Sequence, residues 1–342
     1  MQIRYPRPLR AGDLIGVTSP SSGVGAKEQG RLEYALGGLG ERGFDVTIGE
    51  CMDGKTHVSA PAEQRAAELM GMLLDPRIRA IVPPWGGETA IDLLPHLDFD
   101  AIAQAEPTWF VGYSDISTLL TPLTLLTGLA TVHGSNLMDT PYDLPAPLLP
   151  WTDVVALPAG STFRQASPGV HRLGEWDDWE AHPEVSQRAW NGEGTWTRLD
   201  AGTRPVDVSG RLIGGCIETL ANLAGSRYGD TNRLRTGSET GVIVYVEASG
   251  DEALSICRNL HGMRLAGFFE GARAILVGRT GAPDSPTLTQ AEAVLDALAV
   301  LGVPIISDVE CGHVPPQLPI VNGALGRLVF TDSEQYLEQS LV

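Results

Sequence analysis

The first 140 residues alternate short apolar runs with longer segments of helical periodicity. Runs rich in β-branched residues predict strands at 14–18, 44–48, 80–82, 109–112 and 129–132. The segments between them predict helices at 27–39, 61–74 and 116–126, and Leu69, Met72 and Leu73 share one helical face. Strands separated by helix-length segments are typical of βαβ units, so we expect a mostly parallel sheet.

The regular pattern stops between residues 141 and 205. Six prolines fall between Pro141 and Pro168, which predicts a linker or an irregular crossover. An aromatic stretch overlaps and follows it, with tryptophans at 151, 176, 179, 190 and 196 among acidic residues and glycines. No helix or strand period fits this stretch, so we expect a long loop. Loops of this length in a compact protein are usually functional or disordered, and clustered tryptophans argue against disorder.

Regular structure resumes near Val206. The pattern predicts helices at 214–223 and 254–265, and a third that runs from a capping box at Thr287–Gln290 to Leu301. Strands are expected at 242–246, 274–277 and 303–307. The chain therefore divides into residues 1–150, a crossover at 151–205, and residues 206–342, and its predicted class is α/β.

The charge balance narrows the range of partners. Lysine and arginine total 24 against 42 acidic residues, a net charge of −18. An acidic surface repels phosphate backbones, so we expect no nucleic-acid partner, and a small anionic ligand would need local arginines. The N-terminus lacks an apolar signal-peptide core, and no run approaches the ~18 apolar residues of a membrane span. We therefore expect a cytoplasmic protein without a membrane partner.

Three polar residues follow three predicted strands: Ser114, Glu247 and His313. Ligands bind at the carboxyl ends of strands in open α/β sheets, so these side chains are expected on one side of the molecule. A hydroxyl, an imidazole and a carboxylate are the parts of a nucleophile with its base and orienting acid. The alternatives are an N-cap for Ser114, a solvent-facing strand end for Glu247 and an exposed loop position for His313.

Other motifs are partial or absent. The Gly-x-Ser-x-Gly elbow is incomplete, because Gly112 is present but Ile116 occupies the last position. Gly86 and Gly87 follow a strand, where their amides could approach a substrate as an oxyanion hole or simply form a turn. No dinucleotide fingerprint follows the first strand. Cys311-x-His313 lacks a second ligand pair and the four cysteines form no CxxC, so we expect no metal and no cofactor.

Taken in order, several motifs resemble the LD-carboxypeptidase family of serine peptidases. They are Trp85-Gly-Gly87, Phe110-Val-Gly-Tyr-Ser-Asp-Ile-Ser-Thr-Leu119, Thr131-Val-His-Gly134, Gly210-Arg-Leu-Ile-Gly-Gly-Cys-Ile-Glu-Thr-Leu220, Val244-Tyr-Val-Glu247 and Gly312-His313. The resemblance covers nearly the whole chain. It implies an N-terminal Rossmann-like parallel-sheet domain, a smaller C-terminal α/β domain, a catalytic cleft between them, and a homodimer without metal or cofactor.

The resemblance also implies roles for individual residues. Ser114 would be the nucleophile, His313 the base and Glu247 the acid that orients it. The backbone amides of Gly87 and Asp115 would form the oxyanion hole, beside Gly86.

Within the family, the chain looks more like the microcin C self-immunity type, which cleaves an amide joining an aspartyl residue to a nucleotide moiety. The long loop would then supply aromatic rings that stack on a nucleobase, with Trp176, Trp179, Trp190 and Trp196 as candidates. Arg172, Arg188 or Arg198 could neutralise a phosphate. The alternative is a murein LD-carboxypeptidase that releases D-alanine from tetrapeptides, and the tryptophans would then be a packed cluster.

Overall fold

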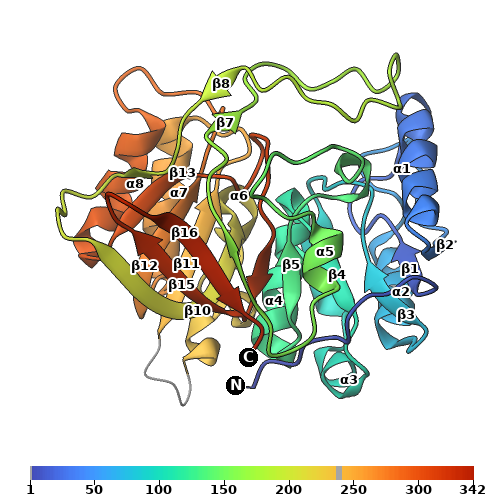
Figure 1. Cartoon of the computed structure of the whole chain (residues 1–342). Helices are drawn as coiled ribbons and strands as arrows, with labels where there is room; N and C mark the ends of the chain where they lie inside the picture. Colours follow the sequence, from blue (N-terminus) through green and yellow to red (C-terminus); the bar gives the residue numbers. More distant parts are fainter. Residues whose placement is uncertain (1, 236–240) are drawn as a thin grey trace.

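The computed structural model describes residues 2–235 and 241–342 of the chain, which fold around two helix-covered sheets (Figure 1). The first sheet has the order β14-β5-β4-β3-β1-β2. Its strands are β1 (Leu14–Val17), β2 (Asp45–Ile48), β3 (Ile78–Ile81), β4 (Trp109–Gly112), β5 (Thr131–His133) and β14 (Ile320–Asn322). All pair in parallel except β14, which runs antiparallel to β5. The predicted α/β class with a parallel sheet is confirmed.

Three helices of this first part lie close to their predicted ranges: α1 (Gln29–Glu41), α2 (Ala62–Leu74) and α4 (Ser117–Thr127). Two short helices were not predicted: α3 (Phe99–Gln104) and α5 (Trp151–Val155), the second at the start of the segment expected to be a crossover. The helix α4 is buried along almost its whole length, because it lies between the first sheet and β10 of the second. This position explains why its sequence is apolar on nearly every side.

The second sheet has eight strands in the order β6-β16-β15-β10-β11-β12-β13-β9. They are β6 (Thr162–Gln165), β9 (Thr197–Arg198), β10 (Val206–Cys216), β11 (Val242–Glu247), β12 (Ala272–Gly278), β13 (Ile305–Val309), β15 (Leu325–Phe330) and β16 (Gln335–Ser340). The central strands β10 to β13 are parallel. Each of the strands β10, β11 and β12 is followed in sequence by a helix: α6 (Ile217–Leu220), α7 (Ala253–Leu265) and α8 (Gln290–Leu298).

Two local predictions in this part were wrong. Residues 214–216 continue strand β10, and only 217–220 are helical. The cause is the Gly214-Gly215 pair: Gly215 has φ +148°, and a Cβ on it would lie 2.6 Å from Ser117 of α4, so these glycines serve close packing. The capping box of α8 is formed by Thr289 with Glu292, rather than by a residue of the predicted Thr287 start.

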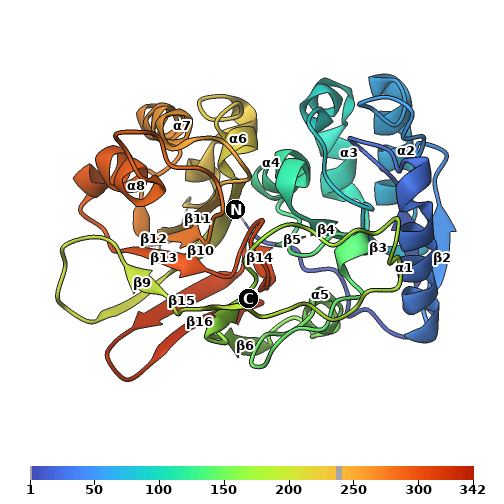
Figure 2. The same ribbon diagram turned by 90° about the horizontal axis from the view of Figure 1, so that it is seen from above.

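The chain does not divide cleanly between the two sheets. Strand β14 comes from the C-terminal end of the sequence but joins the first sheet, and it lies between β5 and β10 (Figure 2). Strands β6 and β9, from the crossover, join the second sheet. Residues 206–342 therefore contribute a strand to the sheet built by residues 1–150.

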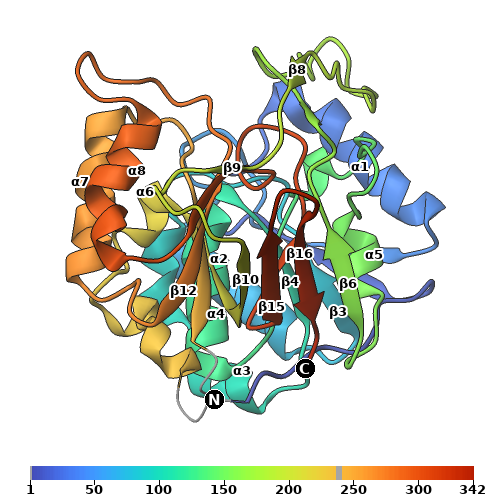
Figure 3. The ribbon, with the colours of Figure 1, turned by 60° about the vertical axis from the view of Figure 1, so that its left-hand side comes forward.

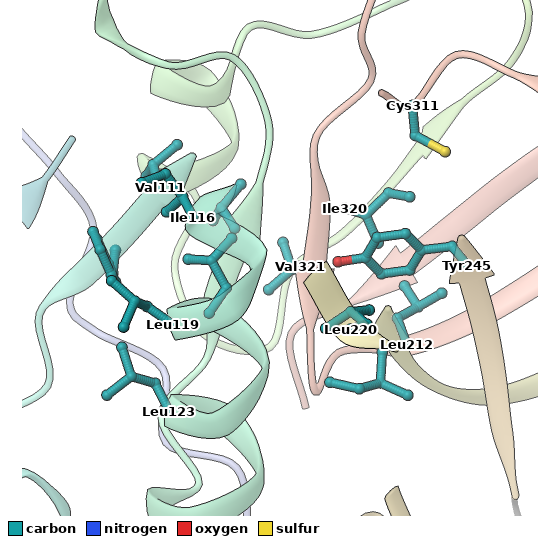
Figure 4. Close-up of a cluster of buried hydrophobic side chains, with 14 of the residues drawn as sticks. Val111, Ile116, Leu119, Leu123, Leu212, Leu220, Tyr245, Cys311, Ile320 and Val321 are labelled. Atoms are coloured by element: carbon teal, nitrogen blue, oxygen red, sulfur yellow. The ribbon is translucent and has the colours of Figure 1, made fainter. Parts of the chain in front are cut away.

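A shared apolar core joins the two sheets (Figure 4). Side chains of β4 and α4 face side chains of β10, β11, α6 and β14 across it. They include Val111, Ile116, Leu119 and Leu123 on one side and Leu212, Leu220, Tyr245, Ile320 and Val321 on the other. Each of these residues is essentially buried, and burying one such side chain is worth roughly 1.5–3 kcal/mol. This core fixes the relative position of the two sheets.

The crossover passes over the ends of both sheets (Figures 1 and 3). It contains the short hairpin of β7 (Val170–His171) and β8 (Gly192–Glu193). Between these strands the chain reaches α1, where Arg31 donates to the carbonyls of Pro183 and Val185. At the other end, the Arg172 amide donates to the Pro315 carbonyl. In the part of the chain that the structure describes, no helix is long and apolar enough to cross a membrane.

Candidate active site

Ser114 lies on a sharp turn between β4 and α4. All four residues of β4 are buried, and Ser114 opens the short 3-10 helix that leads into α4. Its φ is +62°, a conformation that a serine adopts only when the surroundings enforce it. A Cβ on Gly112 would lie 2.7 Å from Asn136 Oδ1 and 2.8 Å from Ile116, so the turn needs glycine two residues before the serine. The turn thus has elbow geometry although its sequence motif is incomplete.

The three residues predicted at strand ends meet in one hydrogen-bonded chain. Nε2 of His313 is 3.1 Å from Oγ of Ser114, and Nδ1 of His313 is 2.8 Å from Oε2 of Glu247. Glu247 is the last residue of β11 and is fully buried. His313 lies in the loop between β13 and β14, where Gly312 (φ +105°) lets the backbone approach Glu247. The order hydroxyl, imidazole, carboxylate is that of a nucleophile, its base and an orienting acid.

The electrostatics of the pair suit this order. Burial alone would raise the pKa of Glu247, but His313 and His133 outweigh it and lower that pKa to about 2. Burial lowers the pKa of His313, and the facing Glu247 carboxylate more than compensates, so the pKa of His313 is raised from its ordinary value. Glu247 therefore stays ionised beside the imidazole, which stabilises the imidazolium that forms when His313 takes a proton.

The loop with Gly86 and Gly87 packs directly against the serine turn. A Cβ on Gly86 would lie 2.9 Å from Ser114 Cβ and 3.1 Å from the Asp115 nitrogen. Gly87 has φ +144°, and a Cβ there would overlap the Ser21 and Ser22 hydroxyls. The Asp115 carboxylate accepts from Ser21 Oγ at 2.6 Å and from the Ala90 amide at 2.8 Å. Asp115 thus ties this loop to the serine turn with its side chain, a role that its neighbours in sequence do not indicate.

A cavity of about 770 Å³ opens beside Ser114 and His313. Gly86, Gly87 and Trp85 line it on one side, and the crossover residues Trp176 and Trp179 line it on another. Its wall also carries five carboxylates and one lysine: Glu28, Asp139, Asp177, Asp178, Glu180 and Lys27. Lys27 pairs with Glu180 at 2.8 Å, which links the crossover to the segment before α1. A smaller cavity of about 440 Å³ shares His313 and Trp176 with the first.

The four candidate tryptophans differ in their exposure and in whether they line a cavity. Trp176 is 52% exposed at the cavity, and Trp179 is half-buried there with its Nε1 donating to Tyr142 Oη at 2.8 Å. Trp190 is not among the residues that line either cavity. Trp196 differs from the prediction, because it is buried beside β9 and donates to the buried Glu310 carboxylate at 2.7 Å. Trp196 therefore packs inside the protein instead of facing a ligand.

The three candidate arginines all hold carboxylates of this chain. Arg172 contacts Asp177 at 2.5 Å, Arg188 contacts Asp139 at 2.9 Å, and Arg198 contacts Asp200 at 2.8 Å. The Arg188–Asp139 pair is buried, and Arg188 also lies over the Tyr142 ring at 3.7 Å. Each guanidinium thus forms an ion pair within this chain. The partners of Arg172 and Arg188 are carboxylates of the cavity wall.

One group of metal-ligating types lies apart from the cavity, among the residues that the structure describes. Cys257 and His261 of α7 and Asp296 of α8 place their donor atoms within 4.8 Å of one another. Arg264 donates to Nδ1 of His261 at 3.1 Å, so Nε2 carries the ring proton and donates to Asp296 at 2.8 Å. Hydrogen bonds alone account for this group.

Several residues of the site were not predicted as functional. Tyr113, directly before Ser114, donates to Asp139 at 3.2 Å, and both line the cavity. His133, the last residue of β5, is buried beside Glu247. His133 carried a usable signal, because it also ends a strand, next to the one that precedes Ser114. Asp139 carried none, since it ends a short 3-10 helix and does not follow a predicted strand.

Comparisons with known proteins agree with this arrangement. The model of the LD-carboxypeptidase N-terminal domain matches residues 15–134, and that of the C-terminal domain matches residues 209–328. A putative carboxypeptidase of Vibrio cholerae is 29% identical, with 99% of this chain and 98% of that protein covered. The Escherichia coli microcin C7 self-immunity protein MccF is 27% identical, with 96% of each chain covered.

Two further comparisons concern a murein enzyme and a solved structure. A probable murein peptide carboxypeptidase of Bacillus subtilis is 25% identical, with 93% of this chain and 89% of that protein covered. The solved structure of MccF in complex with aspartyl sulfamoyl adenosine has a TM-score of 0.79 at 22% identity, with 98% of each chain covered. The structural likeness extends over both sheets.

Proposed function

Because this chain belongs to the LD-carboxypeptidase family and is a serine-type carboxypeptidase, we propose that it hydrolyses an amide bond in an aminoacyl- or peptidyl-nucleotide by a Ser114–His313–Glu247 triad. The observation that carries the proposal is the unbroken chain from Ser114 Oγ through both ring nitrogens of His313 to buried Glu247. A nucleophile, a base and an orienting acid in hydrogen-bond reach are the geometric signature of this chemistry.

The first half-reaction forms an ester on Ser114. His313 Nε2 takes the hydroxyl proton while Oγ attacks the amide carbonyl carbon, and the carbonyl oxygen becomes an oxyanion. The amides of Gly87 and Asp115 are the proposed donors to that oxygen, since the glycine loop packs on the serine turn. Collapse of the intermediate breaks the carbon–nitrogen bond, and the imidazolium gives its proton to the leaving nitrogen.

The second half-reaction regenerates the serine. His313, neutral again, takes a proton from water as the water oxygen attacks the ester carbon. Collapse of this second intermediate breaks the bond to Oγ, and His313 returns the proton to Ser114. Throughout, Glu247 holds Nδ1–H of His313 and remains ionised, as its lowered pKa requires.

The cavity supports a substrate with an aromatic, nucleotide-like part. Trp176 and Trp179 offer two rings beside the triad, and stacking one base on an aromatic ring is worth about 1–3 kcal/mol. Lysine or arginine side chains pair with three of the five carboxylates on the wall, which leaves an excess of negative charge that opposes an anionic group. The base and sugar must therefore supply most of the binding energy. MccF, a relative over 96% of the chain, has been solved with aminoacyl sulfamoyl nucleosides. Self-immunity or detoxification is the proposed role.

Two substrates test this proposal against the murein alternative. Purified protein is incubated with aspartyl sulfamoyl adenosine and, separately, with a murein tetrapeptide, and the products are separated by liquid chromatography. We expect release of sulfamoyl adenosine and aspartate, with little D-alanine from the peptide. Release of D-alanine alone would overturn the proposal and favour the murein alternative, to which the similarity to a probable murein peptide carboxypeptidase of Bacillus subtilis corresponds.

The homodimer and the cytoplasmic location expected from the sequence stay predictions. Light scattering on the purified protein distinguishes the 36.4 kDa chain from a dimer.

A further inference from the structure

A second histidine lies against the buried carboxylate of the triad. His133 is the last residue of β5 and is 1% exposed. Its Nε2 is 3.9 Å from Oε1 of Glu247, the carboxylate oxygen that His313 leaves free. Within the described residues, both ring nitrogens of His133 and Oε1 of Glu247 lack a hydrogen-bond partner.

A hydrogen bond between Nε2 of His133 and Oε1 of Glu247 would satisfy two of these unpartnered atoms. Leaving a buried polar atom without a hydrogen bond destabilises the folded protein. Here a donor and an acceptor face each other across 3.9 Å. A shift of about 1 Å would bring the two atoms to ordinary hydrogen-bond distance. The neighbouring rings fix His133 from the sides, with centroid distances of 5.2 Å to Tyr245 and 6.3 Å to Tyr113.

We propose that His133 is a positioning residue of this active site: its Nε2–H donates to Oε1 of Glu247 and fixes the carboxylate that orients His313. The inference rests on the proposed function, because it acts through the Ser114–His313–Glu247 triad. His133 does not line the substrate cavity, so it has no direct contact with substrate.

The position of His133 gives this contact a second consequence. His133 and Ser114 lie at the ends of the neighbouring strands β5 and β4 of the first sheet, whereas Glu247 ends β11 of the second. His313 lies in the loop that leads from β13 of the second sheet to β14 of the first. The contact between His133 and Glu247 therefore joins the sheet that carries Ser114 to the sheet that carries the acid. The contact would therefore fix the position of Ser114 relative to His313 as well as the position of Glu247 relative to His313.

The charge environment gives the proposal a measurable sign. A donor on Oε1 draws on the same carboxylate charge that raises the pKa of His313, so its loss leaves more of that charge to His313. The pKa of His313 then rises, and the acid limb of kcat/KM moves to higher pH. The titratable groups that act on Glu247 are His313 and His133, and the groups around that carboxylate are Cys216, Cys311, Tyr113 and Tyr245. The groups that act on His313 are Glu247, Glu218 and Asp139.

The test compares His133→Ala, His133→Gln and Tyr245→Phe with wild type on whichever substrate the enzyme turns over. We expect His133→Ala to lower kcat by about 10–100-fold, the range typical when a group that orients a metal ligand is lost. KM should be nearly unchanged, and the acid limb should lie at higher pH. His133→Gln keeps an N–H donor near the position of Nε2, so it should restore most of kcat and the wild-type acid limb.

Tyr245→Phe is the matched structural control. The Tyr245 hydroxyl donates to Asn322 at 2.8 Å, which is also a buried contact between the two sheets, but it does not touch Glu247. This variant should lower the melting temperature without moving the acid limb. A folded His133→Ala with wild-type kcat and pH profile, or a His133→Gln as impaired as His133→Ala, would overturn the proposal.

Two readouts separate the possible failures. If Ser114→Ala keeps full activity, the triad itself fails; if Ser114→Ala is inactive while His133→Ala matches wild type, only the role of His133 fails. Should His133→Ala not fold, a crystal structure of the wild type decides. We expect His133 Nε2 within 3.2 Å of Glu247 Oε1 there, and a separation that stays near 3.9 Å overturns the proposal.

Discussion

Oγ of Ser114 lies 3.1 Å from Nε2 of His313, although 199 residues separate the two in the chain. Ser114 follows β4 of the first sheet, and His313 follows β13 of the second. Their contact therefore exists only while the two sheets are docked through the apolar core (Figure 4). A displacement of about 1 Å between reacting groups can cost a hundredfold in rate, so we expect changes in the packing between α4 and β10 to lower the rate.

Replacing the proposed nucleophile should abolish turnover without unfolding the protein. Ser114→Ala removes the attacking oxygen, and loss of a triad member typically lowers kcat by about 10⁴-fold or more. Steady-state assays and thermal unfolding of the same preparation measure both effects. Ser255→Ala, on α7 and outside the cavity, should retain wild-type rates. A Ser114→Ala enzyme with a rate close to wild type would mean that another group attacks the substrate.

Neutralising the buried acid should change both rate and pH dependence. Glu247 raises the pKa of His313, so Glu247→Gln should lower that pKa and move the acid limb of kcat/KM to lower pH. We expect kcat to fall by about 10⁴-fold, because the amide can no longer stabilise the imidazolium. pH–rate profiles between pH 4 and 9 measure the shift. An acid limb that stays in place or moves to higher pH would contradict the assigned pairing.

The two cavity tryptophans should act on substrate binding. Trp176→Ala removes a 52% exposed ring, so it should raise KM for a nucleotide substrate about 5–150-fold, the equivalent of 1–3 kcal/mol, with little effect on stability. Trp179→Ala should also lower stability, since its Nε1 holds Tyr142. Trp190→Ala, outside both cavities, is the control. Equal losses on a nucleotide and on a simple peptide would indicate that the rings only support the loop.

Asp115 should matter through its side chain. Its Oδ2 accepts from both Ser21 Oγ and the Ala90 amide, and Asp115→Asn would weaken at least one of these contacts. The loop with Gly86 and Gly87 would then loosen against the serine turn, so we expect a lower kcat with a nearly unchanged KM. The two constants from steady-state kinetics check this. Unchanged kcat in a correctly folded variant would show that the loop is held by other contacts.

The sequence was most informative about candidate site residues that directly follow predicted strands. Ser114, Glu247 and His313 could be singled out because each follows a predicted strand, and open α/β sheets gather their ligands there. The same logic would have selected His133. The parallel strands and main helices were also predictable, because their periodicity is local.

Other features depend on partners that local patterns do not reveal. Trp196 was a candidate for stacking on a ligand, but it is buried and donates to Glu310, which lies 114 residues away in the sequence. The helix predicted from residue 214 was wrong at its start, because Gly214 and Gly215 serve packing inside the sheet region: a Cβ on Gly214 would overlap Tyr245 of β11, and one on Gly215 would overlap Ser117 of α4. Strand β14 joins the first sheet from the far end of the chain, a pairing fixed by three-dimensional packing alone.

The most direct test of the triad is to trap the ester on Ser114. Wild-type protein is quenched with acid during turnover of aspartyl sulfamoyl adenosine or, if that is inert, of the murein tetrapeptide, and its peptides are mapped by mass spectrometry. We expect the acyl group of the substrate on the peptide that contains Ser114, and none on that peptide in Ser114→Ala. An active enzyme that carries the acyl group on another residue, or whose turnover survives the loss of Ser114, would contradict it.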